Sequence, residues 1–286
     1  MKSNRKRSTL FLLPSILGTM ILFVLPFGVV VFFSVVSSPV NGHFVGFENY
    51  IDLFRNTAFQ LAAKNTALMC GISVPLAVIL ALLMAILLSP EMPGRSVFQS
   101  VFLSPLFVPV ASVVMIFRIM FHQNGMLNEF LSQCGIDPIN FLQSDWSRCV
   151  VILLYLWKNL GYNMILFMAA LAGVPKEILE AVQLDGGGKL RQFFSVKLYY
   201  ISPTVLFVTI LSLISSMRLF REVYLLAGAY PYQDLYLLQH FMNNTFLSMN
   251  YQKLCSAAIV LSMCMITVIG GLFILEARLG KDLENT

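Results

Sequence analysis

A glycine-rich segment, Gly186-Gly187-Gly188-Lys189, has the residue types of a loop that could bind phosphate. In a P-loop, backbone N–H groups surround the phosphates, and the lysine is followed by a Ser or Thr that holds Mg²⁺. This segment has Gln183 where the motif needs its first glycine and Leu190 where it needs the hydroxyl. We therefore expect no nucleotide site and no ATP hydrolysis on this chain.

Patterns for other chemistry are missing from the sequence as well. It has no HExxH, no CxxC and no convincing nucleophile–base pair, and His43, His122 and His240 are too scattered for a metal site. We expect no enzyme, no bound metal and no cofactor.

Polar side chains in two otherwise apolar stretches could instead bind a solute. They are Lys158, Asn159, Tyr162, Asn163, Ser212, Ser215, Ser216 and Arg218. Such groups are costly in lipid and usually face a cavity or another helix, so ordinary hydrogen bonding between helices is the alternative explanation. We expect Lys158 to extend to the outer membrane interface, and Arg221 and Glu222 to be solvated or locally paired.

The elements that must position these residues are membrane-spanning helices. Apolar and aromatic residues make up 58% of the 286 residues and charged residues only 12%, against about 25% charged in soluble domains. This composition excludes a soluble enzyme and a nucleic-acid binder. A bilayer core of roughly 30 Å needs about 20 apolar helical residues. Six stretches meet this need, at approximately 10–36, 66–88, 99–121, 150–172, 201–219 and 254–275.

Basic residues indicate the orientation of these spans. Lys and Arg concentrate before the first span, in the segment between the fourth and fifth spans, and in the C-terminal tail. Because cytoplasmic loops carry the excess of Lys and Arg, both termini are predicted to be cytoplasmic. No domain boundary is visible, so we expect residues 1–286 to form one transmembrane domain.

The cytoplasmic segment 174–199 is predicted to form two short helices. Pro175 suits a first helical turn, the Gly186–Gly188 run suits a stop, and a second helix follows from Lys189. An amphipathic helix of this kind could lie on the lipid surface. Its two glutamates and the small Ala181 favour insertion into a groove of another protein.

This segment resembles the signature loop of ABC importer permeases. Glu180-Ala181-Val182 is followed after three residues by Gly186 and after nine more by Val196-Lys197-Leu198. The family pattern is EAA, three residues, G, nine residues, I-x-L-P. Val182 replaces the second alanine and Tyr199 the final proline. The resemblance implies coupling helices that dock on an ATP-binding subunit. The coupling residues it implies are Glu180, Ala181, Val182, Asp185 and Gly186.

Other segments are similar to the carbohydrate-uptake branch of that family, especially the larger maltose permease and the glycerol-phosphate and lactose permeases. They are Val45–Tyr50, Asn65-Thr66, Leu103–Pro105, Gly125–Asn128 and Leu156–Tyr162. The resemblance implies an all-α integral membrane protein with the type I ABC importer permease (MetI-like) fold. Its coupling helices would lie between spans four and five.

The implied function is translocation of a sugar, oligosaccharide or related polyol by alternating access. The implied partners are a second permease subunit in a heterodimer, two ATP-binding cassette subunits and an extracytoplasmic binding protein, in the plasma membrane of a prokaryote. The implied solute contacts are approximately Asn163, Ser212 and Ser216. A self-contained secondary carrier or channel is the alternative, but it offers no reason for the coupling loop and often shows an internal repeat.

Overall fold

The computed structural model describes residues 12–38, 40, 42–88 and 94–284. In these residues the secondary structure is helical, apart from one isolated β-bridge between Val36 and Phe44. The chain divides into two compact units. One comprises Met1–Gln60 and Phe241–Thr267, and the other Leu61–His240 and Val268–Thr286.

The first unit contains the first apolar helix, Leu12–Ser34, whose second part is α2 (Leu25–Ser34). The Asn49 side chain in α3 (Glu48–Arg55) donates hydrogen bonds to the carbonyl oxygens of Ser34 (3.0 Å) and Val36 (2.9 Å). Because the last carbonyls of a helix have no partner within it, Asn49 closes the end of α2 and fixes the loop that follows.

The second unit holds the helices that position the candidate site. Those before the cytoplasmic segment are α4 (Thr57–Leu87), α5 (Arg95–Phe107), α6 (Val110–Met120), α7 (Met126–Gln133) and α8 (Ser147–Ala172). Those after it are α9 (Lys176–Leu184), α10 (Lys189–Gln192), η2 (Phe193–Lys197), α11 (Leu198–Tyr200), α12 (Ser202–Met217), α13 (Phe220–Ala227) and η3 (Gln233–Leu235). Of the last two helices, α14 (Leu238–Leu247) belongs mostly to the first unit, and α15 (Tyr251–Glu284) is divided between the two units.

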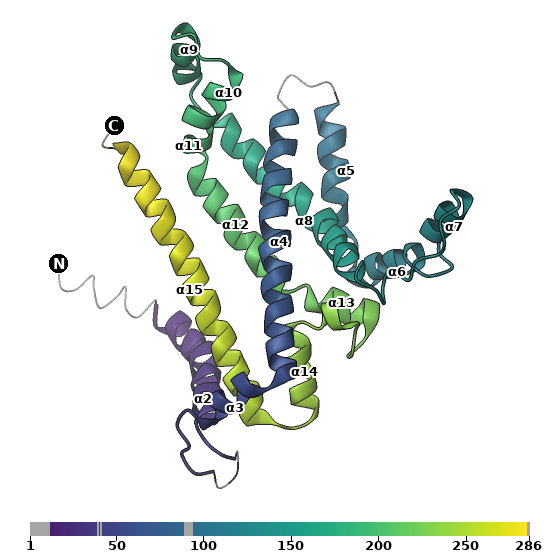
Figure 1. The fold of residues 1–286 in the computed structure, drawn as a ribbon. Helices are drawn as coiled ribbons and strands as arrows, with labels where there is room; N and C mark the ends of the chain where they lie inside the picture. Colours follow the sequence, from purple (N-terminus) through teal and green to yellow (C-terminus); the bar gives the residue numbers. More distant parts are fainter. Residues whose placement is uncertain (1–11, 39, 41, 89–93, 285–286) are drawn as a thin grey trace, which may run out of the picture. The chain divides into compact units, whose positions relative to one another are not determined.

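The predicted third span, 99–121, is wrong as a single helix. The chain bends by 100° between α5 and α6 (Figure 1). Pro109 explains the break, because proline lacks an N–H for the helix ladder and disfavours helical geometry in the residue before it. Val108 is accordingly extended, with φ −79° and ψ 129°.

Among the described residues, five helices are long and apolar enough to cross a membrane, and the bent pair brings the number of spans to six if it counts as one span. The predicted fourth span, 150–172, coincides with α8 to within three residues. The predicted sixth span, 254–275, falls within the longer helix α15, and the predicted second span, 66–88, ends one residue beyond the longer helix α4. The fifth, 201–219, contains α12 and ends just before α13, whose separate helix the sequence analysis did not predict.

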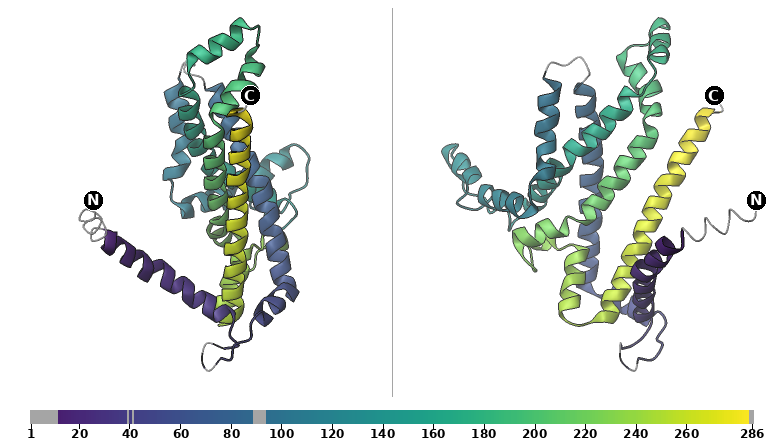
Figure 2. Two further views of the ribbon diagram at one scale, coloured as in Figure 1. Left: turned by 90° about the vertical axis from the view of Figure 1, so that its left-hand side faces the viewer. Right: turned by 180° about the vertical axis from the view of Figure 1, so that it is seen from behind.

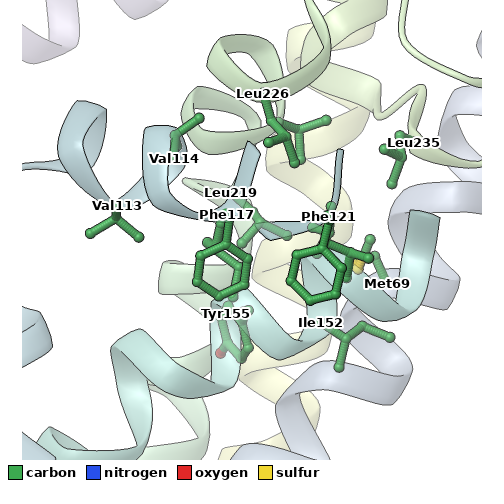
Figure 3. Close-up of a cluster of buried hydrophobic side chains, with 14 of the residues drawn as sticks. Met69, Val113, Val114, Phe117, Phe121, Ile152, Tyr155, Leu219, Leu226 and Leu235 are labelled. Carbon is green, nitrogen blue, oxygen red and sulfur yellow. The ribbon is translucent and has the colours of Figure 1, made fainter. Parts of the chain in front are cut away.

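Two clusters of buried apolar side chains hold the second unit together. Figure 3 shows the first, in which Phe117 of α6 and Phe121, which directly follows α6, stack with ring centroids 5.7 Å apart. The second cluster gathers around Phe167 of α8 and Val208 of α12, and it reaches Val196 in segment 174–199. These two clusters fix both ends of α8 against its neighbours. Polar side chains of α8 between the two clusters are therefore held in defined positions.

Candidate functional site

Segment 174–199 forms the two short helices predicted from its sequence. α9 ends where Gly186 takes φ +80°, a conformation that side-chain-bearing residues avoid. The Gly187 N–H then donates to the Val182 carbonyl at 2.9 Å. The second helix is continuous through α10, η2 and α11, with a π-helical turn in its middle. Figure 2 shows these helices at the end of α8 and α12 away from α6 and α7.

Four of the five predicted coupling residues are exposed, namely Glu180, Ala181, Asp185 and Gly186. Val182 is half-buried and packs on the cluster that contains Val196. The Gln192 side chain also donates to the Leu179 carbonyl at 3.2 Å, tying the second helix to α9. Val182 and Gln192 therefore hold the two helices of the segment together, while its outer face is exposed.

The predicted solute contacts are brought together only in part. Asn163 of α8 donates to the Ser212 hydroxyl of α12 at 2.9 Å, and both side chains are buried. Ser216, one turn further along α12, donates to the Leu213 carbonyl at 2.7 Å. Its oxygen lies 3.2 Å from the Cys70 sulfur of α4. Hydrogen bonding between helices, the alternative weighed for these residues, is thus present for the Asn163–Ser212 pair.

A cavity of about 410 Å³ lies beside this pair. Asn163 lines it, whereas Ser212 and Ser216 are buried between helices. The whole lining is Leu106, Val108, Val110, Tyr155, Lys158, Asn159, Tyr162, Asn163, Leu211, Ser215, Arg218, Leu219, Arg221 and Glu222.

Two neutral polar residues of this cavity were seen in the sequence but not predicted as solute contacts. Ser215 donates to the Asn159 side-chain oxygen at 2.6 Å, and Asn159 donates to the Tyr155 carbonyl at 2.8 Å. Helical spacing could have identified Asn159 as a residue on the same face of α8 as Asn163. Tyr155, Asn159, Tyr162 and Asn163 lie at i, i+4, i+7 and i+8, which places them on one face of α8.

Charged residues also line the cavity, and they pair with one another. Lys158 does not extend alone to an interface: its ammonium donates to a carboxylate oxygen of Glu222. Glu222 is buried, with 5% of its side chain exposed, rather than solvated. Arg221 is largely exposed and approaches the same oxygen at 3.7 Å, so the predicted local pairing is present.

Two of the other sequence segments singled out have a structural role. The Asn65 side chain of α4 donates to the carbonyls of Gln233 (2.6 Å) and Tyr236 (3.2 Å). The Asn128 side chain likewise donates to the carbonyls of His122 (3.1 Å) and Ile139 (2.8 Å). Both asparagines satisfy backbone groups of irregular segments, which otherwise would lack partners away from water.

The sequence is similar to those of known transport proteins. Residues 73–284 match the family described as "Binding-protein-dependent transport system inner membrane component". The sulfoquinovosyl glycerol transport system permease protein SmoG of Agrobacterium fabrum is 28% identical over 93% of this chain and 89% of its own length. The arabinooligosaccharides transport system permease protein AraP of Halalkalibacterium halodurans is 31% identical over 70% and 67%.

The fold is similar to that of a solved transporter. A chain in the crystal structure of a bacterial ABC transporter involved in the import of the acidic polysaccharide alginate superposes with a TM-score of 0.82. The match covers 97% of this chain and 98% of the other, at 21% sequence identity. At this identity the likeness concerns the fold.

Proposed function

Because this chain belongs to the family of inner membrane components of binding-protein-dependent transport systems, we propose that it forms one half of the path by which such a system imports a sugar, oligosaccharide or related polyol. The chain is a permease, and a separate subunit hydrolyses ATP. Membership of this family leaves a self-contained carrier or channel without support.

The cavity between α8 and α12 is the observation that carries the solute assignment. Its neutral lining includes Asn159, Tyr162, Asn163 and Ser215. Amide and hydroxyl groups both donate and accept hydrogen bonds, which suits a solute with many hydroxyls. The named relatives transport sulfoquinovosyl glycerol and arabinooligosaccharides, and others transport lactose and sn-glycerol-3-phosphate. In this proposal Asn163 contacts the solute, while Ser212 and Ser216 orient the wall behind it.

The cytoplasmic segment is proposed as the contact with the ATPase. Its exposed face combines Glu180, Ala181 and Asp185 with the apolar side chains of Leu184 and Leu190, which are 89% and 76% exposed. Apolar side chains this exposed on a water-facing loop are typical of a docking surface. The braced interior of the segment suits a part that moves as a rigid body when the ATPase closes.

The assembly follows from the same proposal. Residues 1–286 form a single permease domain with six spans in the type I arrangement, counting α5 and α6 as one interrupted span. It pairs with a second permease, giving a heterodimer, and with two ATP-binding cassette subunits and an extracytoplasmic binding protein. Both termini lie in the cytoplasm of a prokaryote, as the distribution of Lys and Arg predicts.

The test is uptake by the complete complex in proteoliposomes, with lactose, arabinotriose and sn-glycerol-3-phosphate as probes. We expect ATP-dependent and binding-protein-dependent import of at least one probe. Asn163→Leu should raise the KM or abolish import while the complex still assembles. ATP-dependent uptake of none of the three, with uptake of amino acids or inorganic ions instead, would overturn the solute class.

Ser212→Ala is the matched control, because it removes the hydrogen-bond partner of Asn163 without altering the cavity lining. If Asn163 only ties the helices together, both variants should lower thermal stability equally and leave the KM unchanged. A rise in KM confined to Asn163→Leu supports contact with the solute.

A further inference from the structure

The Lys158–Glu222 pair leaves one carboxylate oxygen unused. The ammonium of Lys158 and the guanidinium of Arg221 both approach Oε1 of Glu222. The other oxygen, Oε2, is buried and has no hydrogen-bond partner among the described residues. A buried acceptor without a partner lowers stability, and more so when it is charged. Native structures keep few such groups, so each one calls for a structural or functional explanation.

This carboxylate stands at the candidate solute site. Glu222 and Lys158 line the 410 Å³ cavity together with Asn159, Asn163 and Ser215. The last torsion of a glutamate side chain is broad and soft. A small rotation can therefore turn the free oxygen toward the cavity while the other oxygen keeps the ammonium of Lys158.

We propose that Glu222 contacts the transported solute, accepting a hydrogen bond from a solute hydroxyl, and that Lys158 is the positioning residue that holds the carboxylate in place. The inference rests on the polyhydroxylated solute proposed above and adds a specific contact to it. An ionised carboxylate only accepts hydrogen bonds, and it binds a hydroxyl about twice as strongly as a neutral acceptor does. Glu222 therefore selects a donor group of the solute and repels phosphate or carboxylate at this point.

The experiment uses the complete complex with the same three probes, and uptake is normalised to the amount of assembled complex. Glu222→Gln keeps the size of the side chain but removes the charge. We expect kcat/KM for import to fall roughly 10-fold or more, the usual effect of losing a hydrogen bond to a charged group. The control is Glu129→Gln on the exposed surface of α7, which should import like the wild type.

Two double variants separate solute contact from a structural brace. Lys158→Glu/Glu222→Lys restores an ion pair but places a donor where the solute needs an acceptor. Lys158→Met/Glu222→Leu replaces the pair by apolar side chains of similar volume, which buried sites often tolerate. We expect at least one of the two to assemble, and import by the assembled complex to remain at least about 10-fold below wild type.

Wild-type import by Glu222→Gln, or by either assembled double variant, would show that the pair is only a brace and would overturn the inference. That outcome leaves the proposed function intact, because the wild-type complex still imports the probe. Failure of the wild type itself to import any of the three probes would overturn the proposed solute class, and this inference with it.

Discussion

Gly161 of α8 lies directly against the backbone carbonyl of Phe102 in α5. A Cβ atom built on Gly161 would be 1.9 Å from that oxygen, far inside contact distance. Small residues let membrane helices approach closely, and here the absence of a side chain sets the separation of α5 and α8. Gly161 also lies on the helix that carries Lys158, Asn159 and Asn163, so this contact positions one wall of the cavity.

Gly161→Ala should force α5 and α8 apart. Because the obstructing atom belongs to the backbone rather than to a flexible side chain, we expect a clear loss of thermal stability and of assembled complex. Overpacking of this kind typically costs about 1–3 kcal/mol. The measurement is the thermal unfolding midpoint of the purified complex. Gly71→Ala in α4 is the control, since a Cβ there meets nothing within 4 Å, and an equal loss in both variants would contradict the explanation.

Gly186→Val should uncouple transport from ATP hydrolysis. Space does not forbid the substitution, because a Cβ at Gly186 meets nothing within 4 Å. The cost comes from φ +80°, and an L-residue in that conformation loses roughly 1–2 kcal/mol. Gly188 also has open space, but its φ is −66°, so Gly188→Val is the matched control. We expect copurification of the ATPase and solute uptake to fall only in Gly186→Val. Normal uptake by Gly186→Val would contradict the proposed role of Gly186 in coupling.

Glu180→Lys tests the chemistry of the same surface. The side chain is exposed, so reversing its charge should leave the fold and membrane insertion unchanged. If Glu180 contacts the ATPase, the reversal should weaken that association through charge repulsion or a lost partner. The measurement is copurification of the ATPase subunit, and wild-type yield together with wild-type uptake would remove Glu180 from the interface.

The orientation can be tested with a native cysteine. Cys134 follows α7 and is exposed, in a loop predicted to lie outside the cell. In a variant with Cys134 as its only cysteine, an impermeant thiol reagent should label intact cells. A variant whose only cysteine replaces Lys189 should be labelled only after permeabilisation. The reverse pattern would invert the topology.

His240 predicts a dependence of stability on pH. It lies in α14, outside the candidate spans, and its side chain is fully buried. Burial lowers the pKa of His240 from 6.5 to about 4. Between pH 6.5 and pH 4, His240 therefore binds a proton in the unfolded chain but not in the folded chain. The free energy of unfolding consequently falls as the pH drops from 6.5 toward 4, and His240 does not affect it above pH 6.5.

His240→Asn should reduce this dependence. Asparagine can still accept the Leu237 N–H that His240 accepts at 3.3 Å, but it does not titrate. The measurement is the unfolding midpoint of the complex at pH 7.5 and pH 5.5. We expect a smaller drop in the variant than in the wild type, and equal drops would show that other groups control the acid sensitivity.

Sequence reasoning succeeded where one local rule decides the structure. The fourth span was recognisable despite Lys158, because apolar residues continue on both sides of it. The two short helices of segment 174–199 were recognisable from Pro175 and the glycine run. The break at Pro109 was missed because proline is tolerated in membrane helices, where it often only kinks them. Only the packing of α6 against its neighbours decides between a kink and a turn of 100°.

The cavity was harder to predict than the helices around it. The polar residues of α8 and α12 were visible, but which of them face a cavity depends on the rotation of each helix. The partner of Lys158 is 64 positions away, on the short helix α13 beyond the predicted fifth span, which was not predicted from the sequence. Pairing across such a distance is a property of the tertiary fold and leaves no periodic signal in the sequence.

The bend at Pro109 has a consequence for the lipid around the protein. With 13 and 11 residues, α5 and α6 are about 20 Å and 17 Å long at 1.5 Å per residue. Neither reaches across a hydrocarbon layer of roughly 30 Å, and two helices at 100° cannot both follow the membrane normal. The third apolar stretch has enough residues to cross the hydrocarbon layer, but the bend makes its extent along the membrane normal smaller than the thickness of that layer. The bilayer beside α5 must therefore become thinner, or other protein surface must fill the difference, which makes this side of the molecule sensitive to the acyl-chain length of its lipids.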